Sequence, residues 1–201
     1  RRIGQGNPGV KVGEGYTDYS QGAFRVTDNN YDFALSGDGF FTVEFTNKNG
    51  ETSTMYTRDG NFTVTADGYL VTTDGDYVMA RGANNSSERI KVNPNEAIVV
   101  DQQGRIMQNN QMVAQMKITN FNDYNYLEHY GENYYVPVEG AELELATDCK
   151  VFQGYLETSN VSIVSEMVEM ISVSKQYEAN QKLIQTYDSS LQIAANQLGK
   201  I

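Results

Sequence analysis

Cysteine, histidine and tryptophan are almost absent from this 201-residue sequence, which has one Cys, one His and no Trp. With Cys149 alone, the chain has no internal disulfide and no thiolate cluster for a metal ion. With His129 alone, neither a zinc hydrolase site nor a Ser–His–Asp triad is expected. The sequence therefore predicts a protein that is not an enzyme and that holds no cofactor or metal.

Long apolar runs and basic stripes are missing as well. No stretch approaches the ~18 apolar residues that cross a bilayer, and no signal peptide is present. The chain has 26 Asp and Glu against 15 Lys and Arg, and its net charge of −11 repels nucleic acid and anionic membranes. We expect no nucleic acid, no small-molecule substrate and no membrane insertion, and any export must proceed without a cleaved signal peptide.

Residues 16–158 are expected to form a β-rich body. Runs rich in Thr, Val, Tyr and Phe are separated by Asn-Gly or Asp-Gly pairs. These pairs accept the positive φ of tight hairpin turns, so their spacing predicts a meander of hairpins. The pairs are at positions 49–50, 59–60, 67–68 and 74–75.

A tyrosine-rich stretch lies late in this body. It contains Tyr124, Tyr126, Tyr130, Tyr134 and Tyr135. Tyrosine is favoured both in strands and at interfaces, so two interpretations stay open. The cluster either binds carbohydrate or protein, or it closes the end of the β-body.

The hydrophobic period changes near Asn160, and the segment 159–201 is expected to be one long assembly helix. No Pro or Gly interrupts residues 160–198, either Asn160 or Ser162 fits an N-terminal cap, and Gly199 fits a C-terminal one. Apolar residues at steps of three and four form a seam that predicts packing in a coiled coil or bundle. The seam comprises Ile163, Met167, Met170, Ile171, Val173, Tyr177, Asn180, Ile184, Tyr187, Leu191, Ala194 and Leu198.

The length of this helix argues for a partner helix. An ordinary amphipathic helix lying across the β-body is the simpler interpretation. A helix over 162–198 would however be about 55 Å long, more than a body of about 160 residues covers. We therefore expect the seam to face another helix, with the polar Asn180 helping to select the register.

Three stretches of the sequence carry a resemblance to a known family. They read QGAFRVTDNNYDFALSGDGFFTV at 21–43, YTRDGNF at 56–62 and QGYLETSNV at 153–161. In this order they resemble the flagellar basal-body rod and hook proteins, most closely the distal rod members. The motif residues in the body are Gly37, Gly39, Phe40, Phe41, Tyr56, Arg58, Gly60 and Phe62.

The resemblance implies a structural subunit of the flagellar basal-body rod, outside the cytoplasmic membrane. Such a subunit assembles with copies of itself and with other rod or hook subunits into a helical tube. The family pairs an N-terminal helix with the C-terminal one, whereas this chain starts at Arg1 without a methionine. We therefore expect a truncated chain in which residues 1–15 are a flexible linker from an absent helix.

The motif residues are expected to act by packing. Gly37 and Gly39 would allow a positive φ or a close backbone approach where a strand begins. Phe40 and Phe41 would point to opposite faces of that strand. The function implied by the resemblance then depends on how the body and the helix pack.

Acidic residues raise the question of a catalytic or calcium site. Those considered are Asp38, Asp59, Asp67, Asp74 and Asp76. They stand beside glycines in turn motifs, where Asp is expected for backbone reasons alone. The alternative function kept open is a carbohydrate- or adhesin-like binding module on a helical stalk, which a cleft with convergent aromatic side chains would favour.

Overall fold

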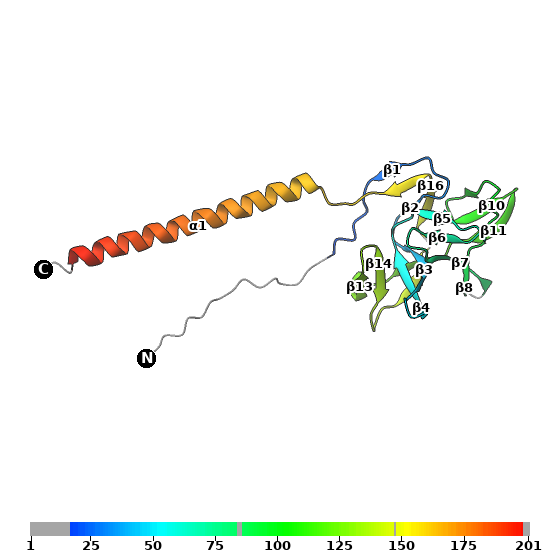
Figure 1. The fold of residues 1–201 in the computed structure, drawn as a ribbon, viewed down its shortest axis with the longest axis horizontal. Coiled ribbons are helices and arrows are strands. Elements are labelled where there is room, and N and C mark those ends of the chain that lie inside the picture. The colour runs from blue at the N-terminus through cyan, green and yellow to red at the C-terminus, as the bar shows by residue number, and fades with distance from the viewer. Residues whose placement is uncertain (1–16, 84–85, 147, 199–201) are drawn as a thin grey trace. The chain divides into compact units, whose positions relative to one another are not determined.

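A computed structural model describes residues 17–83, 86–146 and 148–198, apart from the side chains of residues 197 and 198. The expected linker over 1–15 lies outside these residues, and so does the side chain of Leu198. The chain divides into two compact units, residues 1–158 and residues 159–201. Figure 1 shows the strands gathered in the first unit and a single helix in the second.

The first unit, the body, consists of short strands and one described 3₁₀ turn. In chain order these are β1 (Phe24–Val26), β2 (Phe33–Ser36), β3 (Phe40–Thr46), β4 (Thr52–Thr57), β5 (Phe62–Val64), β6 (Leu70–Thr72), β7 (Tyr77–Arg81), β8 (Ser87–Arg89), β9 (Val99–Val100), β10 (Arg105–Gln108), β11 (Gln111–Gln115), β12 (Ile118–Phe121), η2 (Tyr124–Tyr126), β13 (Leu127–Tyr130), β14 (Tyr134–Pro137), β15 (Leu143–Leu145), β16 (Lys150–Gln153) and β17 (Tyr155–Glu157).

The strands pair both locally and across the whole length of the body. The main sheet has the order β13-β14-β4-β3-β7-β6-β5, with β8 beside β7 and β12 joining β3 to β15. The pairs β3–β4, β5–β6, β10–β11 and β13–β14 are hairpins between consecutive strands. The pairs β1–β17 and β2–β16 instead join the first strands of the body to its last. The body is therefore a meander that long-range pairs close.

Three of the four expected glycine turns are hairpin turns. Gly50, Gly68 and Gly75 have φ of +83°, +86° and +94°, in the left-handed region that glycine accepts. The prediction of a hairpin at Gly60 is wrong, because β4 and β5 do not pair with each other. A Cβ at Gly60 would lie 1.8 Å from the carbonyl oxygen of Phe33, and the Phe33 N–H donates to the Gly60 carbonyl at 3.0 Å. This glycine permits close contact between two backbone segments.

Phe40 and Phe41 are neighbours in β3 but belong to different hydrophobic clusters, as the alternation of side chains along a strand predicts. Phe41 lies in the main core, where its ring centroid is 5.1 Å from that of Phe62. Phe40 lies in a smaller cluster with Tyr56 and Phe121. Full burial of each such side chain is worth about 1.5–3 kcal/mol, so both sides of β3 stabilise the body.

The second unit contains the single helix α1 (Ile163–Leu198). The Ser162 hydroxyl accepts from the N–H of Ser165 at 3.5 Å, and its carbonyl accepts from the N–H of Glu166 at 3.0 Å, so Ser162 caps the helix. The prediction of a β-rich body with one long C-terminal helix is confirmed. Among the described residues, no helix is both long and apolar enough to span a bilayer.

Candidate assembly site

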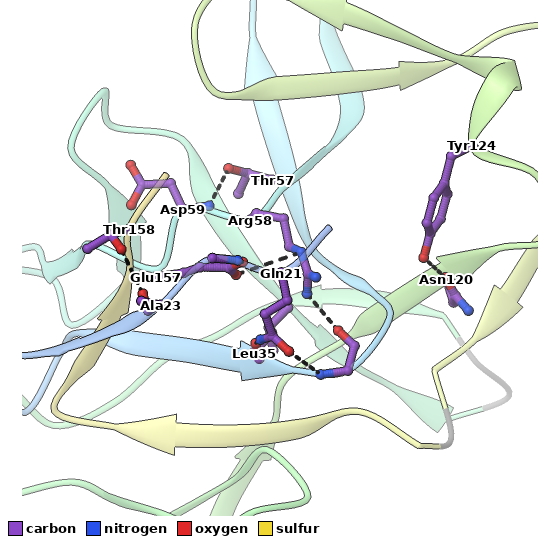
Figure 2. Close-up of polar contacts among 12 residues, drawn as sticks. Gln21, Ala23, Leu35, Thr57, Arg58, Asp59, Asn120, Tyr124, Glu157 and Thr158 are labelled. Atoms are coloured by element: carbon purple, nitrogen blue, oxygen red, sulfur yellow. Dashed lines mark hydrogen bonds and ion pairs between the residues drawn. The ribbon is translucent and has the colours of Figure 1, made fainter. Parts of the chain in front are cut away.

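The three stretches that stand out in the sequence meet at one place in the body. Figure 2 shows Gln21 from the first stretch, Arg58 from the second and Glu157 from the third around the start of β1 and the end of β17. β1 and β17 run antiparallel, with Val26 opposite Tyr155. The segments that lead into and out of the body therefore lie side by side.

Glu157 connects these two segments to the core sheet. Its Oε1 accepts from the N–H of Gly22 at 2.8 Å, and its Oε2 lies 3.8 Å from Arg58 Nε. Arg58 in turn donates from Nη1 to the carbonyl of Gly37 at 2.8 Å. The side chains of Arg58 and Glu157 are only 20% and 13% exposed, so this ion pair is less screened by water than a surface pair.

Gln21 and Thr158 complete the connection. The Gln21 side chain donates from Nε2 to the carbonyl of Leu35 at 2.5 Å and accepts from the N–H of Gly37 at 3.3 Å. Thr158 donates from its backbone N–H and its hydroxyl to the carbonyl of Ala23, at 2.8 and 2.9 Å. We call Gln21, Arg58, Glu157 and Thr158 the terminal clamp, because they fix both ends of the body to its sheet.

The terminal clamp requires a glycine at position 37. Gly37 has φ +102°, and a Cβ there would lie 3.0 Å from the carbonyl oxygen of Asp148. Gly39 has φ +151°, and its Cβ would lie 2.9 Å from the Ile118 side chain. Any other residue at position 37 would strain the turn whose carbonyl and N–H bind Arg58 and Gln21.

The side chains of the α1 seam are exposed. Nine large apolar residues of the seam are 52–75% exposed, namely Ile163, Met167, Met170, Ile171, Val173, Tyr177, Ile184, Tyr187 and Leu191. Asn180 and Ala194 are exposed too. The structure thus places the predicted seam on one described helix, but it contains no second helix among the described residues to pack on it.

Apolar residues also occur on α1 outside the seam. Val164, Val168, Leu183 and Ile193 are 56–72% exposed. They widen the apolar surface beyond the narrow stripe that a two-stranded coiled coil requires. This distribution is typical of a helix that packs against more than one neighbour.

The acidic turn residues bind groups of the body itself. Asp59 accepts from the N–H of Asn61 at 3.0 Å through Oδ1, as Asp does in a turn. The Tyr134 hydroxyl donates to Asp76 Oδ2 at 2.7 Å and lies 3.4 Å from Asp74 Oδ2. Burial, together with these two carboxylates, raises the pKa of Tyr134 well above its usual range. These carboxylates fix the β13–β14 hairpin to the core.

The tyrosine cluster divides between the two interpretations left open. Tyr124 and Tyr135 pack around Phe40, with ring centroids 5.7 and 5.2 Å from it, and close that end of the body. Tyr126 and Tyr130 are 43% and 47% exposed and remain available for contacts.

Sequence reasoning missed the role of Gln21 and Glu157. Both residues are inside the stretches that carry the resemblance. Gln21 directly precedes Gly22, and Glu157 follows shortly after Gly154. Their partners are 14 to 135 residues away, and no local period indicates such contacts. The one hint that the sequence offered was the position of each polar residue close to glycines and large apolar residues.

Comparison with known proteins supplies the context of these motifs. Residues 34–119 match the family described as the flagellar hook protein FlgE/F/G D1 domain, and residues 153–198 match the C-terminal family of the flagellar basal body rod FlgEFG proteins. The first segment runs from β2 to β12, and the second contains β17 and α1.

Several whole proteins are similar over most of the chain. The flagellar basal-body rod protein FlgG of Buchnera aphidicola subsp. Schizaphis graminum is 34% identical over 180 residues, which cover 87% of this chain and 67% of that protein. FlgG of Caulobacter vibrioides is 34% identical over 198 residues, covering 94% and 72%. The rod protein FlgF of Caulobacter vibrioides is 30% identical over 184 residues, covering 92% and 72%.

Proposed function

This chain belongs to the flagellar basal-body rod and hook protein family, and from that premise we propose that α1 is the element through which it polymerises with copies of itself. As a member of the family it is a structural subunit of the flagellar basal body, and it assembles with other rod or hook subunits. The homopolymer and the role of α1 are the parts that we propose.

The observation that carries the proposal is the exposure of the α1 seam. Its nine large apolar side chains are more than half exposed, and complete burial of each is worth about 1.5–3 kcal/mol. A helix without tertiary contacts is only marginally stable in water. Association along the seam therefore stabilises the helix and joins the subunits in one step.

The surface of α1 favours a bundle of several helices. Val164, Val168, Leu183 and Ile193 lie outside the seam, so a single partner would leave them in water. Asn180, at a seam position, hydrogen-bonds best when it faces a polar group, which helps to select one register. Helices surrounded on several sides form the inner wall of a tube in this proposal.

The remaining assignments follow the same division of the chain. Residues 16–158 form the outer body, and 159–201 form the assembly helix. The motif residues and the terminal clamp act by packing and positioning, and the chain catalyses no reaction. The subunit works outside the cytoplasmic membrane.

The test places charges on the seam. The double variant Ile184→Asp/Leu191→Asp puts two carboxylates seven residues apart at positions that would be buried in the bundle. Burial of an unpaired charge costs several kcal/mol, so the variant should stay monomeric at concentrations where the unmodified chain associates. Sedimentation velocity and light scattering measure the association, and near-ultraviolet circular dichroism reports whether the body remains folded.

The control carries the same charges on a polar face of α1. Gln185 and Gln192 are exposed, lie seven residues apart and have no large apolar residue three or four positions away. Gln185→Asp/Gln192→Asp should associate like the unmodified chain. Assembly of the seam variant, or a strictly monomeric unmodified chain with a fully formed helix, would contradict the proposal.

A further inference from the structure

A small sheet at one end of the body exposes an apolar patch. In β10, Met107 lies opposite Val99 of β9 on one side and Met112 of β11 on the other. Val113 is next to Met112, beside the irregularity in the register. Val99, Met112 and Val113 are 44–62% exposed, and Met107 is partly exposed. We call these four residues the methionine patch.

A second set of exposed apolar residues lies along the β13–β14 hairpin, with Tyr126 and Val138 at its base and Tyr130 near its turn. Tyr126, Tyr130 and Val138 are 39–47% exposed, and Val138 donates its N–H to the Tyr126 carbonyl at 2.9 Å. We call these three residues the hairpin patch. Tyrosine and methionine are enriched in the buried centres of protein interfaces, whereas single exposed apolar residues need no explanation.

The two patches are on opposite sides of the body. β13 is the last strand of the main sheet and lies four strands from β7, about 19 Å at the usual strand spacing. The small sheet adjoins the end of β7, where Ala80 bridges to Met116 directly after β11 and Lys117 lies between β7 and β3. Figure 1 shows β13 and β14 on one side of the body and β10 and β11 on the other.

The two segments of the chain that contain the patches differ in net charge. Segment 118–149, which contains the hairpin patch, has seven acidic residues and no Lys or Arg. The acidic residues are Asp123, Glu128, Glu132, Glu139, Glu142, Glu144 and Asp148. Segment 77–117, which contains much of the methionine patch and its surroundings, has five basic residues against three acidic ones. The basic residues are Arg81, Arg89, Lys91, Arg105 and Lys117.

We propose that the methionine patch of one copy docks on the hairpin patch of a second copy, so that the bodies join head to tail. This inference rests on the proposed homopolymer and adds a contact between bodies to the contact between helices. Two different patches that meet in this way form a heterologous interface, which continues into a helical filament instead of closing a dimer. β11 and β13 are each the last strand of their sheet, so both also offer an unpaired strand edge at the contact.

The charges disfavour a symmetric contact of the hairpin patch with itself. A contact of the hairpin patch with itself would bring two strongly acidic segments together, and like charges at an interface oppose association. Contact with the methionine patch instead brings that acidic segment to a segment of positive net charge. Apolar area then supplies the affinity, and charge selects the orientation.

Cysteine cross-linking in the full chain distinguishes these arrangements. In a Cys149→Ser background, Val113→Cys is made in one sample and Val138→Cys in another, so that each chain has one exposed thiol. A short bismaleimide should yield cross-linked dimers only when the two samples are mixed. Dimers of comparable yield within either single sample, or none in the mixture, would overturn the proposal.

The same experiment separates this contact from the role of α1. At high protein concentration the mixed cross-link should persist when both chains also carry Ile184→Asp/Leu191→Asp. If the cross-link is lost in a chain that still polymerises, only the proposed contact between bodies is refuted, and the role of α1 stands. Polymerisation of the seam variant at the lowest concentration at which the unmodified chain polymerises refutes the role of α1 and leaves the cross-link as support for the contact between bodies.

A charge variant tests the orientation. Glu128→Lys/Glu132→Lys reverses two exposed charges on the hairpin and should lower the cross-linked yield roughly fivefold at low salt. Glu51→Lys/Asp67→Lys makes the same change in charge on exposed turns outside both patches and should leave the yield within about twofold. Equal effects of the two variants would show that net charge, and not this interface, controls the yield.

Discussion

Arg58 holds together parts of the chain that are far apart in sequence. Its guanidinium binds the Gly37 carbonyl and pairs with Glu157, whose other oxygen binds the Gly22 N–H. Arg58→Gln would leave Glu157 Oε2, which is buried and accepts no hydrogen bond from the described residues, without the one ion-pair partner that it has among them. We expect a loss of about 1.5–3 kcal/mol in the free energy of unfolding of the body, measured with urea.

An exposed ion pair of the body provides the matched control for this variant. Arg105 Nη2 lies 2.7 Å from Asp101 Oδ2, and the two side chains are 47% and 35% exposed. Arg105→Gln should therefore cost less than about 1 kcal/mol. Equal losses for the two variants would mean that the clamp contributes no more than a surface ion pair.

At this scale the sequence predicts the large apolar residues better than the polar ones. Burial of Phe40, Phe41 and Phe62 follows from strand alternation and side-chain size. The partners of Glu157 do not follow, because a hydrogen bond across 135 residues leaves no trace in any local period. The hairpin predicted at Gly60 is wrong for a related reason. An Asp-Gly pair in the sequence is compatible both with a hairpin turn and with a close contact between two backbone segments.

The described side chains of the helix α1 are all exposed, whereas helices in proteins owe most of their stability to tertiary packing. We expect its helix content to rise with protein concentration, from partial in dilute solution to nearly complete when chains associate. Circular dichroism at 222 nm over a range of concentrations measures this change.

The seam variant serves as the control for that measurement. Ile184→Asp/Leu191→Asp should show low helicity that does not depend on concentration, because its helices cannot associate. Full helicity of the unmodified chain at the lowest concentration would contradict the expectation.

Elements were predictable to different degrees. The helix follows from 36 residues of unbroken period, the Ser162 cap and the absence of Pro and Gly. The local hairpins follow from turns such as Gly68 and Gly75. The pairs β1–β17 and β2–β16 were not predictable, because strand partners distant in sequence are chosen by packing of the whole body.

The body as a whole should lose stability in alkaline solution. Burial raises the pKa of the Cys149 thiol to about 11, and it also raises the pKa values of Tyr56, Tyr134 and Tyr135. A group with a raised pKa in the folded state stabilises the fold fully below its unfolded pKa. That contribution is lost as the pH rises through the folded value.

The expected window follows from these values. The free energy of unfolding should begin to fall near pH 9, where an unfolded cysteine ionises, and continue to fall through pH 11 as tyrosines also respond. Urea titrations at pH 7, 9 and 10.5 measure the decline. Cys149→Ser removes one titrating group and should make the decline shallower, whereas an unchanged slope would assign it to the tyrosines alone.

The pairing of β1 with β17 also determines when the body is able to fold. Hydrogen bonds that flank this pairing join residues 135 positions apart, and closing a flexible loop of that length costs about 4 kcal/mol of chain entropy. The chain loses this entropy before the contacts that offset it have formed. Folding dominated by such long-range pairs is therefore slow, on the scale of milliseconds to seconds. A chain that has been made only as far as β15 has every strand of the main sheet but lacks β16 and β17, so it cannot form the pairs β2–β16 and β1–β17. We therefore expect the two ends of the body to be joined in one late step, after the last strand has emerged.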